Sequence, residues 1–507
     1  MSREEMQTRS TSEVELAKYW HDLGQRLQLS PDLPPSSLPE PPAGIPLEDP
    51  VSLSLRRLIG ESHLNEDPDV LQTHAGGETY AGFLHRQQVG AAPQAIVSPT
   101  SEQELVAVML WAAQRDIRIL PWGGGAAPYK DKTQNGEAFI VVKLDLMNRQ
   151  LSINERDRII TMQAGASWQA VREIAQQHGL VPGRSCFRRS CTLGGSIASN
   201  PNTCRSPGYG TLSEDIVRIR TITPAGPISL HGPASSAKDL LGIALGSRGT
   251  WGIITEVTLN LYPQPERRVQ LLANFPTREM GLAALEMVSR RQHHLVAARL
   301  IDIDAIDLFG SQSDQQRFFT PRSWLNNGDS WKMRFCVEMA GSREAVSRTR
   351  RYVEEILRDH GATIEGNGRK AHLQDGLWYY RSLWHDLWLR GLLTHRLATT
   401  VPWAILPGFL LAWEDGLSSV LLSTSGVPGL PITTIHALKH HAQVDTLLLG
   451  HQVSGEISEK IQQIEAIQAV ANEINHRWNV AFEFAPLVDK ALAAAKDALD
   501  LSNVMLD

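Results

Sequence analysis

The sequence is poor in cysteine, with four cysteines among 507 residues. Three of them, Cys186, Cys191 and Cys204, lie close together, but none has the Cys-x-x-Cys spacing of a structural zinc site. The fourth is Cys336. So few cysteines in so long a chain argue against a disulfide framework. We therefore expect no metal site, buried reduced thiols and a cytoplasmic location.

The sequence also lacks a long hydrophobic run. Its most apolar stretch, Val401 to Trp413, is interrupted by Pro402 and Pro407, and it is shorter than the ~20 residues needed to span a bilayer. The first twelve residues are polar and charged, unlike a secretory signal peptide. We expect no transmembrane segment, whereas contact of the apolar stretch with a membrane surface stays open.

Positive charge is not in excess. The chain has 49 Lys and Arg against 55 Asp and Glu, a net charge of −6, so no basic face for nucleic acid is indicated. With 42% hydrophobic residues, the composition is typical of a globular protein. At ~100–200 residues per domain, the length predicts about two to four domains.

Proline divides the N-terminal part, because a helical pattern at 12–29 is followed by a proline-rich stretch at 31–42 that cannot continue a helix. From residue 95, strand and helix patterns alternate. The sequence predicts strands at 95–97, 117–120, 139–143, 159–164, 216–222 and 252–261, and helices at 101–115 and 167–179. Further on, it predicts strands at 269–275 and 331–338 and helices at 278–290, 458–474 and 486–501.

These patterns suggest four segments. Residues 1–90 are expected to form an N-terminal helical arm and linker, and residues 91–266 a first domain. Residues 267–456 are expected to form a second α+β domain, and residues 457–507 a C-terminal helical segment.

The sequence does contain three glycine-bearing turns, each beside an apolar strand-like run: Pro121 to Ala127, Cys191 to Asn200 and Gly246 to Glu256. Glycine lets backbone N–H groups approach a ligand because no Cβ intervenes, so such turns suit a pyrophosphate. A single turn of this kind is more often a tight hairpin. Three in one strand-rich segment indicate a nucleotide cofactor held by the main chain.

In this order, the turns resemble those of FAD-binding flavoproteins of the vanillyl-alcohol oxidase and p-cresol methylhydroxylase type. The most similar branch contains D-lactate or glycolate dehydrogenases and alkyldihydroxyacetonephosphate synthase. The family's Gly-Ser-Glu-Gly-Thr-Leu-Gly-Ile-Ile-Thr-Glu stretch is nearly intact at Gly246 to Glu256, and Tyr209-Gly210 and Glu214-Asp215 match another family stretch. The resemblance implies an α+β fold with a two-subdomain FAD-binding domain of the p-cresol methylhydroxylase type, an α+β cap and C-terminal helices.

The resemblance also implies that the three turns bind FAD. No histidine follows Gly123–Gly125, where some relatives attach flavin covalently, so noncovalent FAD is expected. The implied contacts in the first turn are Pro121, Trp122, Gly123, Gly124, Gly125, Ala126 and Ala127. Those in the second are Cys191, Thr192, Gly194, Gly195, Ala198 and Ser199, and those in the third are Arg248, Gly249, Thr250, Gly252, Ile253 and Ile254.

Two of the turns depart from the family pattern. Ala126-Ala127 stands where the family has Thr-Ser, so two hydroxyl donors are missing, and Arg248 stands where the family has glutamate. Arg248 is a candidate partner for the FAD phosphates. An ordinary solvated surface arginine is an equally good interpretation.

The cap keeps less of the family pattern, because the ether-lipid synthase's histidine cluster and catalytic tyrosine have no counterpart here. His441 and His451 are the candidate acid/base groups, since imidazole titrates near neutral pH. Arg299 matches the arginine of the family's Ile-Arg-Leu-Met-Asp stretch and could bind a carboxylate or phosphate through its fork. His436 and His440 would have metal-ligand spacing on a helix, but the pattern here favours a strand.

Three functions remain open at this point. The first is an FAD-dependent oxidoreductase that moves a hydride from a hydroxyl-bearing small molecule, a 2-hydroxy acid or an alcohol, to flavin N5. The others are a transferase of ether-lipid biosynthesis resembling alkyldihydroxyacetonephosphate synthase, and a catalytically degenerate FAD-binding protein. The expected ligand is a small molecule that is apolar or carries a carboxylate or phosphate. A homodimer also stays open.

Overall fold

The structure, a computed structural model, describes residues 49–74, 84, 93–125, 138–183, 191–200, 206–232, 241–290, 295–302, 332–367, 387–388, 391–438, 440–453, 456–480, 486–500 and 502–505. These residues form two compact units. The first unit contains the described residues of 49–200, 209–264 and 486–505, and the second contains 206–208 and those of 265–480. The predicted helix at 12–29 and the proline-rich stretch lie outside the described residues.

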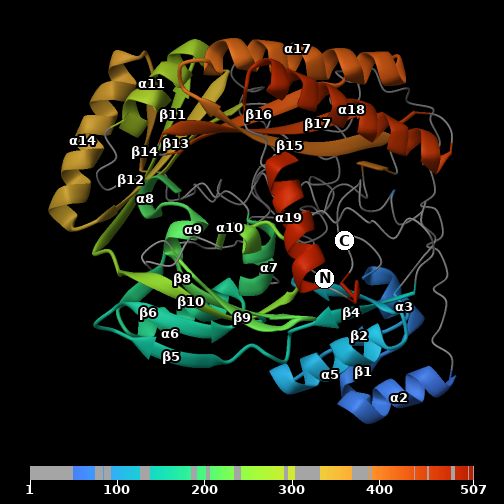
Figure 1. Cartoon of the computed structure of the whole chain (residues 1–507). Helices are drawn as coiled ribbons and strands as arrows, with labels where there is room; N and C mark the ends of the chain where they lie inside the picture. The colour runs from blue at the N-terminus through green and yellow to red at the C-terminus, as the bar shows by residue number, and fades with distance from the viewer. Residues whose placement is uncertain are drawn as a thin grey trace, which may run out of the picture. The chain divides into compact units, whose positions relative to one another are not determined.

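The first unit contains a small sheet with the strand order β1-β2-β4-β3 (Figure 1). Its strands are β1 (Leu64–Asn65), β2 (Ile96–Val97), β3 (Arg118–Trp122) and β4 (Phe139–Lys143). Strand β4 runs parallel to β2 and β3. Helices α2 (Asp49–Ile59) and α5 (Glu102–Ala113) pack together beside it. The predicted start of α5 is confirmed, because the Ser101 side chain accepts a hydrogen bond from Glu104 N.

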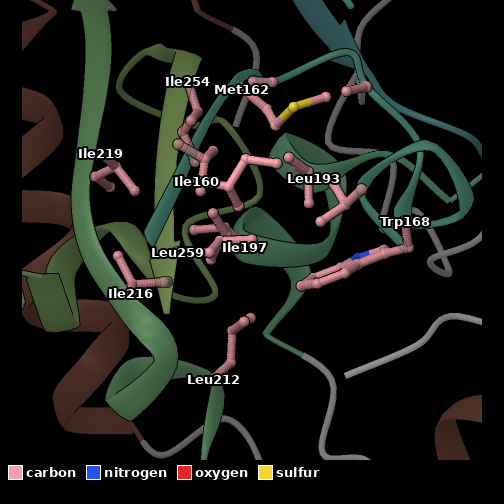
Figure 2. Packing of buried hydrophobic residues seen from close by; sticks show 14 of the residues in the cluster. Ile160, Met162, Trp168, Leu193, Ile197, Leu212, Ile216, Ile219, Ile254 and Leu259 are labelled. Atoms are coloured by element: carbon pink, nitrogen blue, oxygen red, sulfur yellow. The ribbon is translucent and has the colours of Figure 1, made fainter. Parts of the chain in front are cut away.

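The second sheet of this unit is antiparallel, with the order β5-β6-β10-β8-β9 and β7 paired to β10. Its strands are β5 (Gln150–Asn154), β6 (Ile159–Gln163), β7 (Leu180–Pro182), β8 (Ile216–Thr223), β9 (Gly226–His231) and β10 (Ile253–Pro263). Its main helices are α6 (Trp168–Gln177), α7 (Leu193–Ser199) and α19 (Pro486–Leu499). Figure 2 shows Leu193 and Ile197 of α7 packed against Ile160 and Leu259, so the second glycine turn is fixed to the sheet by its own helix.

The second unit is built on a seven-stranded sheet with the order β14-β11-β13-β12-β16-β17-β15. The strands are β11 (Arg267–Phe275), β12 (Leu295–Asp302), β13 (Met333–Gly341), β14 (Thr363–Asn367), β15 (Leu392–Pro402), β16 (Leu430–Ala437) and β17 (His441–His451). Helices α11 (Arg278–Arg290), α14 (Arg343–Asp359), α17 (Leu406–Ser425) and α18 (Ile457–Arg477) cover one face of it (Figure 1).

Two buried hydrogen bonds fix which strand residues face these helices. Trp413 Nε1 of α17 donates to Thr446 Oγ1 of β17 at 2.9 Å, and Thr399 of β15 donates to Asn475 of α18 at 3.2 Å. Because side chains alternate along a strand, residues an odd number of positions away point to the opposite face. That opposite face carries most of the charged side chains considered below.

The predicted strand at 139–143 and the helix at 278–290 are confirmed to the residue. The apolar stretch from Val401 forms the end of β15 and the start of α17, where Trp413 is fully buried in the core. Within the described residues, no helix is both long and apolar enough to cross a membrane.

Candidate functional site

The three glycine turns meet in the first unit. A Cβ added to Gly123 of the first turn would lie 2.8 Å from Thr192 Oγ1 and 3.1 Å from Gly195 Cα of the second. A Cβ on Gly249 of the third turn would lie 2.7 Å from Pro121 Cγ of the first. The shortest distance at each position, 2.8 Å for Gly123 and 2.7 Å for Gly249, is too short for ordinary packing. These two positions therefore require glycine for the turns to touch.

Hydrogen bonds join the second turn to the third. Arg248 N donates to Ala198 O at 2.9 Å, and Gly246 N donates to Ile197 O at 3.2 Å. The second turn is also held to the end of β6, because Gly194 N donates to Ala164 O at 2.9 Å. The site is therefore fixed by main-chain contacts from several elements.

One pocket opens where the turns meet, with about 610 Å³ of empty space including the part open to solvent. We call it the turn pocket. Its lining includes these predicted residues: Pro121, Trp122, Gly123, Thr192, Gly194, Gly195, Ala198, Arg248, Gly249, Gly252, Ile253 and Ile254.

The remaining predicted contacts fall into two groups. Gly124, Gly125, Cys191, Ser199 and Thr250 are described but do not line the turn pocket. Ala126 and Ala127 lie outside the described residues. Contact of any of these residues with FAD stays a prediction.

Sequence reasoning missed one side of the turn pocket. The additional lining residues are Val142, Lys143, Leu144, Asp145, Ala164, Gly165 and Ser247. The signal that could have found the first four is the pairing of β3 with β4: parallel strands end at the same edge of a sheet, and Trp122 pairs with Lys143. Lys143 Nζ lies 3.5 Å from Asp145 Oδ2, and both side chains are partly exposed.

The residues of the turn pocket fit the FAD pyrophosphate. Glycine main chain allows close approach, and Lys143 and Arg248 bring two cations to the same pocket. Arg248 has a φ of 53°, in the left-handed region that non-glycine residues rarely occupy, and Gly249 follows with a φ of 80°. A left-handed arginine beside a pocket is a conformational cost that a phosphate contact would explain.

The expectation of reduced thiols was wrong for Cys191, because Cys191 is disulfide-bonded. Its partner lies outside the described residues, and Cys336 is free and buried. The disulfide could not be predicted from the spacing of cysteines in the sequence, because disulfide formation depends on the distance between the two Cα atoms in space. Cysteine usage therefore no longer argues for a reducing compartment.

The three predicted catalytic residues are not brought together. His441 is exposed at the start of β17, and His451 is half-buried at the other end of that strand. Arg299 lies on β12, is 5% exposed and pairs with neither histidine. Catalytic roles for His441 and His451 stay predictions that this geometry does not support.

Instead, the sheet places Arg299 directly opposite His436 of β16, a histidine that sequence reasoning set aside. The strand register continues this pairing on both sides: Arg299 also lies opposite Cys336 of β13, and His436 lies opposite Gln443 of β17. These four paired residues form a row across the sheet. Directly paired residues point to the same face, and Gln443 is an odd number of positions from Thr446. The row therefore lies on the face opposite the four helices.

Burial controls the charge of this row. It lowers the pKa of His436 to about 4, with smaller effects from Asp445, which raises it, and from Arg299 and Arg396, which lower it. Burial also raises the pKa of the Cys336 thiol. At neutral pH, His436 is a neutral imidazole and Cys336 a neutral thiol, so neither compensates Arg299.

A second arginine of this sheet already has an anion. Arg396 of β15 donates two hydrogen bonds to the carboxylate of Asp445 on the paired strand β17, with Nε to Oδ1 at 2.6 Å. The histidines at 436 and 440 belong to a strand and the turn after it, as the pattern predicted. Among the described residues, no group of three or more His, Cys, Asp or Glu could hold a metal ion.

Part of the chain is similar in sequence to known proteins. Residues 93–229 match the FAD binding domain family. The chain is 33% identical to D-2-hydroxyglutarate dehydrogenase of Xanthomonas citri pv. viticola over 234 residues, which cover 45% of this chain and 48% of that protein. The chain thus spans about half the length of the curated relatives it matches.

The fold extends over almost the whole chain. A structure of alkyldihydroxyacetonephosphate synthase matches 96% of this chain and 91% of its own, with a TM-score of 0.79 and 19% identity. p-Cresol methylhydroxylase with substrate bound matches 90% of this chain and 95% of its own, with a TM-score of 0.67 and 13% identity. Residues 93–229 are thus similar to a FAD binding domain, and the chain has the fold of the p-cresol methylhydroxylase type.

Proposed function

We propose that this protein is an FAD-dependent oxidoreductase that oxidises a small 2-hydroxy acid or a related alcohol. The observation that carries the proposal is the meeting of three glycine turns around one pocket lined by main chain, Lys143 and Arg248. Similarity to a D-2-hydroxy acid dehydrogenase supports the oxidation. When bound, FAD supplies the hydride acceptor for such a reaction.

The chain's own residues have defined tasks in this proposal. Gly123, Gly195 and Gly249 let the three turns approach closely, and Lys143 and Arg248 balance phosphate charge. Histidine is not near the first turn in sequence, which supports noncovalent binding. A cytoplasmic location, a homodimer and contact with a membrane surface stay predictions, to be tested by cell fractionation and by size-exclusion chromatography with light scattering.

The test starts with the absorption spectrum of the purified protein. We expect a yellow protein whose flavin is released by acid precipitation, as noncovalent FAD requires. Anaerobic addition of D-lactate, D-malate or D-2-hydroxyglutarate should then bleach the flavin. A colourless protein that takes up no added FAD would overturn the proposal.

A transferase of the ether-lipid type is the second candidate, because the fold similarity to alkyldihydroxyacetonephosphate synthase extends through the second unit. Incorporation of labelled fatty alcohol into alkyldihydroxyacetone phosphate without net flavin reduction would favour it over oxidation. Flavin bleaching by any of the acids would instead exclude the degenerate FAD-binding protein.

A further inference from the structure

Arg299 is a buried cation for which the described residues supply no ion-pair partner. Its residue is only 5% exposed, yet no ion pair joins it to a carboxylate in the part of the chain that the structure describes. Two carboxylates on the same sheet are already engaged: Asp445 with Arg396, and Glu338 with Arg268 at 3.3 Å. An uncompensated buried charge is costly, so this position calls for an anion that the described chain does not supply.

Two neutral polar atoms on the same face also have no partner among the described residues. They are His436 Nδ1 and Thr434 Oγ1, both fully enclosed. His436 pairs directly with Arg299, and Thr434 is two residues along β16 on the same face. Buried polar atoms nearly always find a hydrogen-bond partner. His436 Nδ1 and Thr434 Oγ1 are exceptions among the described residues, and both belong to residues next to Arg299 on the sheet.

We propose that Arg299, Thr434 and His436 form a binding site for a short 2-hydroxy acid, and we call it the Arg299 site. Arg299 donates to the carboxylate, and His436 and Thr434 hydrogen-bond the neighbouring 2-hydroxyl oxygen. This deepens the proposed function and rests on it for the identity of the substrate. In this site His436, and not His441 or His451, is the group placed to accept the hydroxyl proton.

Charge and size favour a monocarboxylate head over a phosphate. One uncompensated positive charge balances one negative charge, and Asp445, directly opposite Thr434, would repel a dianion. The Cα atoms of directly paired residues in an antiparallel sheet lie ~4.5–5.5 Å apart. A carboxylate and the adjacent hydroxyl span that separation, because only one carbon lies between them.

The first experiment measures binding without turnover. Calorimetric titration of the FAD-loaded protein with 2-hydroxyisobutyrate, a 2-hydroxy monocarboxylate that cannot be oxidised because its C2 carries no hydrogen, should show binding to wild type and at least tenfold weaker binding to Arg299→Met. Arg334→Met is the matched control, because Arg334 is on the same face of the sheet but already bonds Asn274 and Glu365 at 2.9 Å. If 2-hydroxyisobutyrate binds wild type and Arg299→Met equally, or binds neither of them, the Arg299 site is overturned.

A second measurement separates binding from a structural role. Replacing an uncompensated buried charge by an apolar side chain should stabilise the protein, so the Tm of ligand-free Arg299→Met should rise by about 2 °C or more. A structural arginine would give a lower Tm. A fall in Tm together with unchanged affinity for 2-hydroxyisobutyrate contradicts the proposal.

The third measurement is turnover. For acids that bleach the flavin, Arg299→Met should raise KM at least tenfold, and His436→Gln should lower kcat more than it changes KM. FAD content should stay unchanged in both variants. If 2-hydroxyisobutyrate binds at Arg299 but none of the acids reduces the flavin, the anion site is retained and the proposed oxidation is rejected.

Discussion

At the scale of single residues, the informative groups are those whose surroundings contradict their chemistry. Arg299 is charged but buried, His436 is titratable but neutral, and Arg248 has a left-handed backbone without being glycine. None of these properties is visible in the sequence, because each depends on what surrounds the side chain. Sequence reasoning singled out Arg299 by family resemblance, as a fork for a carboxylate or phosphate, and Arg248 by its departure from the family's glutamate, as a partner for the FAD phosphates. It gave neither the burial of Arg299 nor the left-handed backbone of Arg248.

The buried state of His436 predicts acid sensitivity. Its pKa of about 4 lies below the ordinary value of 6.5, so between these pH values the unfolded state binds a proton that the folded state does not. Stability therefore falls as pH decreases through this window, by about 2 kcal/mol for this residue by pH 4.5. Urea unfolding at pH 7.0 and 4.5 should show a smaller loss for His436→Gln.

The control for this prediction is His441→Gln, because His441 is exposed on the adjacent strand. That variant should keep the pH dependence of wild type. If His436→Gln loses as much stability as wild type between the two pH values, the ring is not held neutral by burial.

The place of Arg248 in the lining of the turn pocket predicts that its replacement weakens FAD binding. Arg248→Met removes a cation that lines the turn pocket, and we expect the Kd for FAD to rise about tenfold, the value of one charge-assisted hydrogen bond. Arg158→Met is the control, because Arg158 is also left-handed, with a φ of 54°, but is exposed and outside the lining. Flavin fluorescence titration measures both, and equal Kd values would assign Arg248 to the solvated surface.

At the scale of elements, the prediction from sequence was best where a segment has its own periodicity and turn chemistry. The strand at 139–143 and the helix at 278–290 were found in full. The order of the seven-stranded sheet was not found, since β12 pairs with β16 more than a hundred residues away and local patterns do not encode such pairings. His436 was missed for the same reason: only strand register places it beside Arg299.

One element whose role emerges from the structure is the C-terminal segment after α19. Ile119 N of β3 donates to Val504 O at 2.7 Å, and the buried Asp500 carboxylate accepts hydrogen bonds from Val504 N and Met505 N at 2.9 Å each. This segment therefore pairs with the edge of the strand that leads into the first glycine turn.

Loss of this support should destabilise the first unit. Asp500→Ala leaves two buried N–H groups without their acceptor, and we expect a loss of about 2 kcal/mol in unfolding free energy. Asp497→Ala, at an exposed position of α19, should change stability by less than about 0.5 kcal/mol. Urea denaturation of both variants is the measurement, and equal stabilities would mean that the segment is not held by Asp500.

At the scale of the whole molecule, two separately packed units carry the two kinds of chemistry. The turn pocket belongs entirely to the first unit, and the Arg299 site belongs entirely to the second. Chain length predicted more than one domain, and the glycine turns predicted which part binds the cofactor. The position of the anion site followed only from the three-dimensional pairing of strands.

This division predicts separate protection patterns in amide hydrogen exchange. FAD should slow exchange in 121–125, 191–200 and 246–254, because a bound ligand stabilises the segments that hold it. Addition of 2-hydroxyisobutyrate to the FAD-loaded protein should slow exchange in 295–302 and 430–437. Arg299→Met should remove the second pattern and keep the first, and protection of β16 by FAD alone would contradict the assignment.

The contact between Gly123 and Gly195 has a practical consequence for protein engineering. Even alanine at either position would overlap Thr192 Oγ1, so a randomised library at these sites should return glycine almost alone among flavin-containing clones. Strands β12 and β16 contain no glycine. Efforts to change substrate preference should therefore diversify β12 and β16 and leave the three turns as they are.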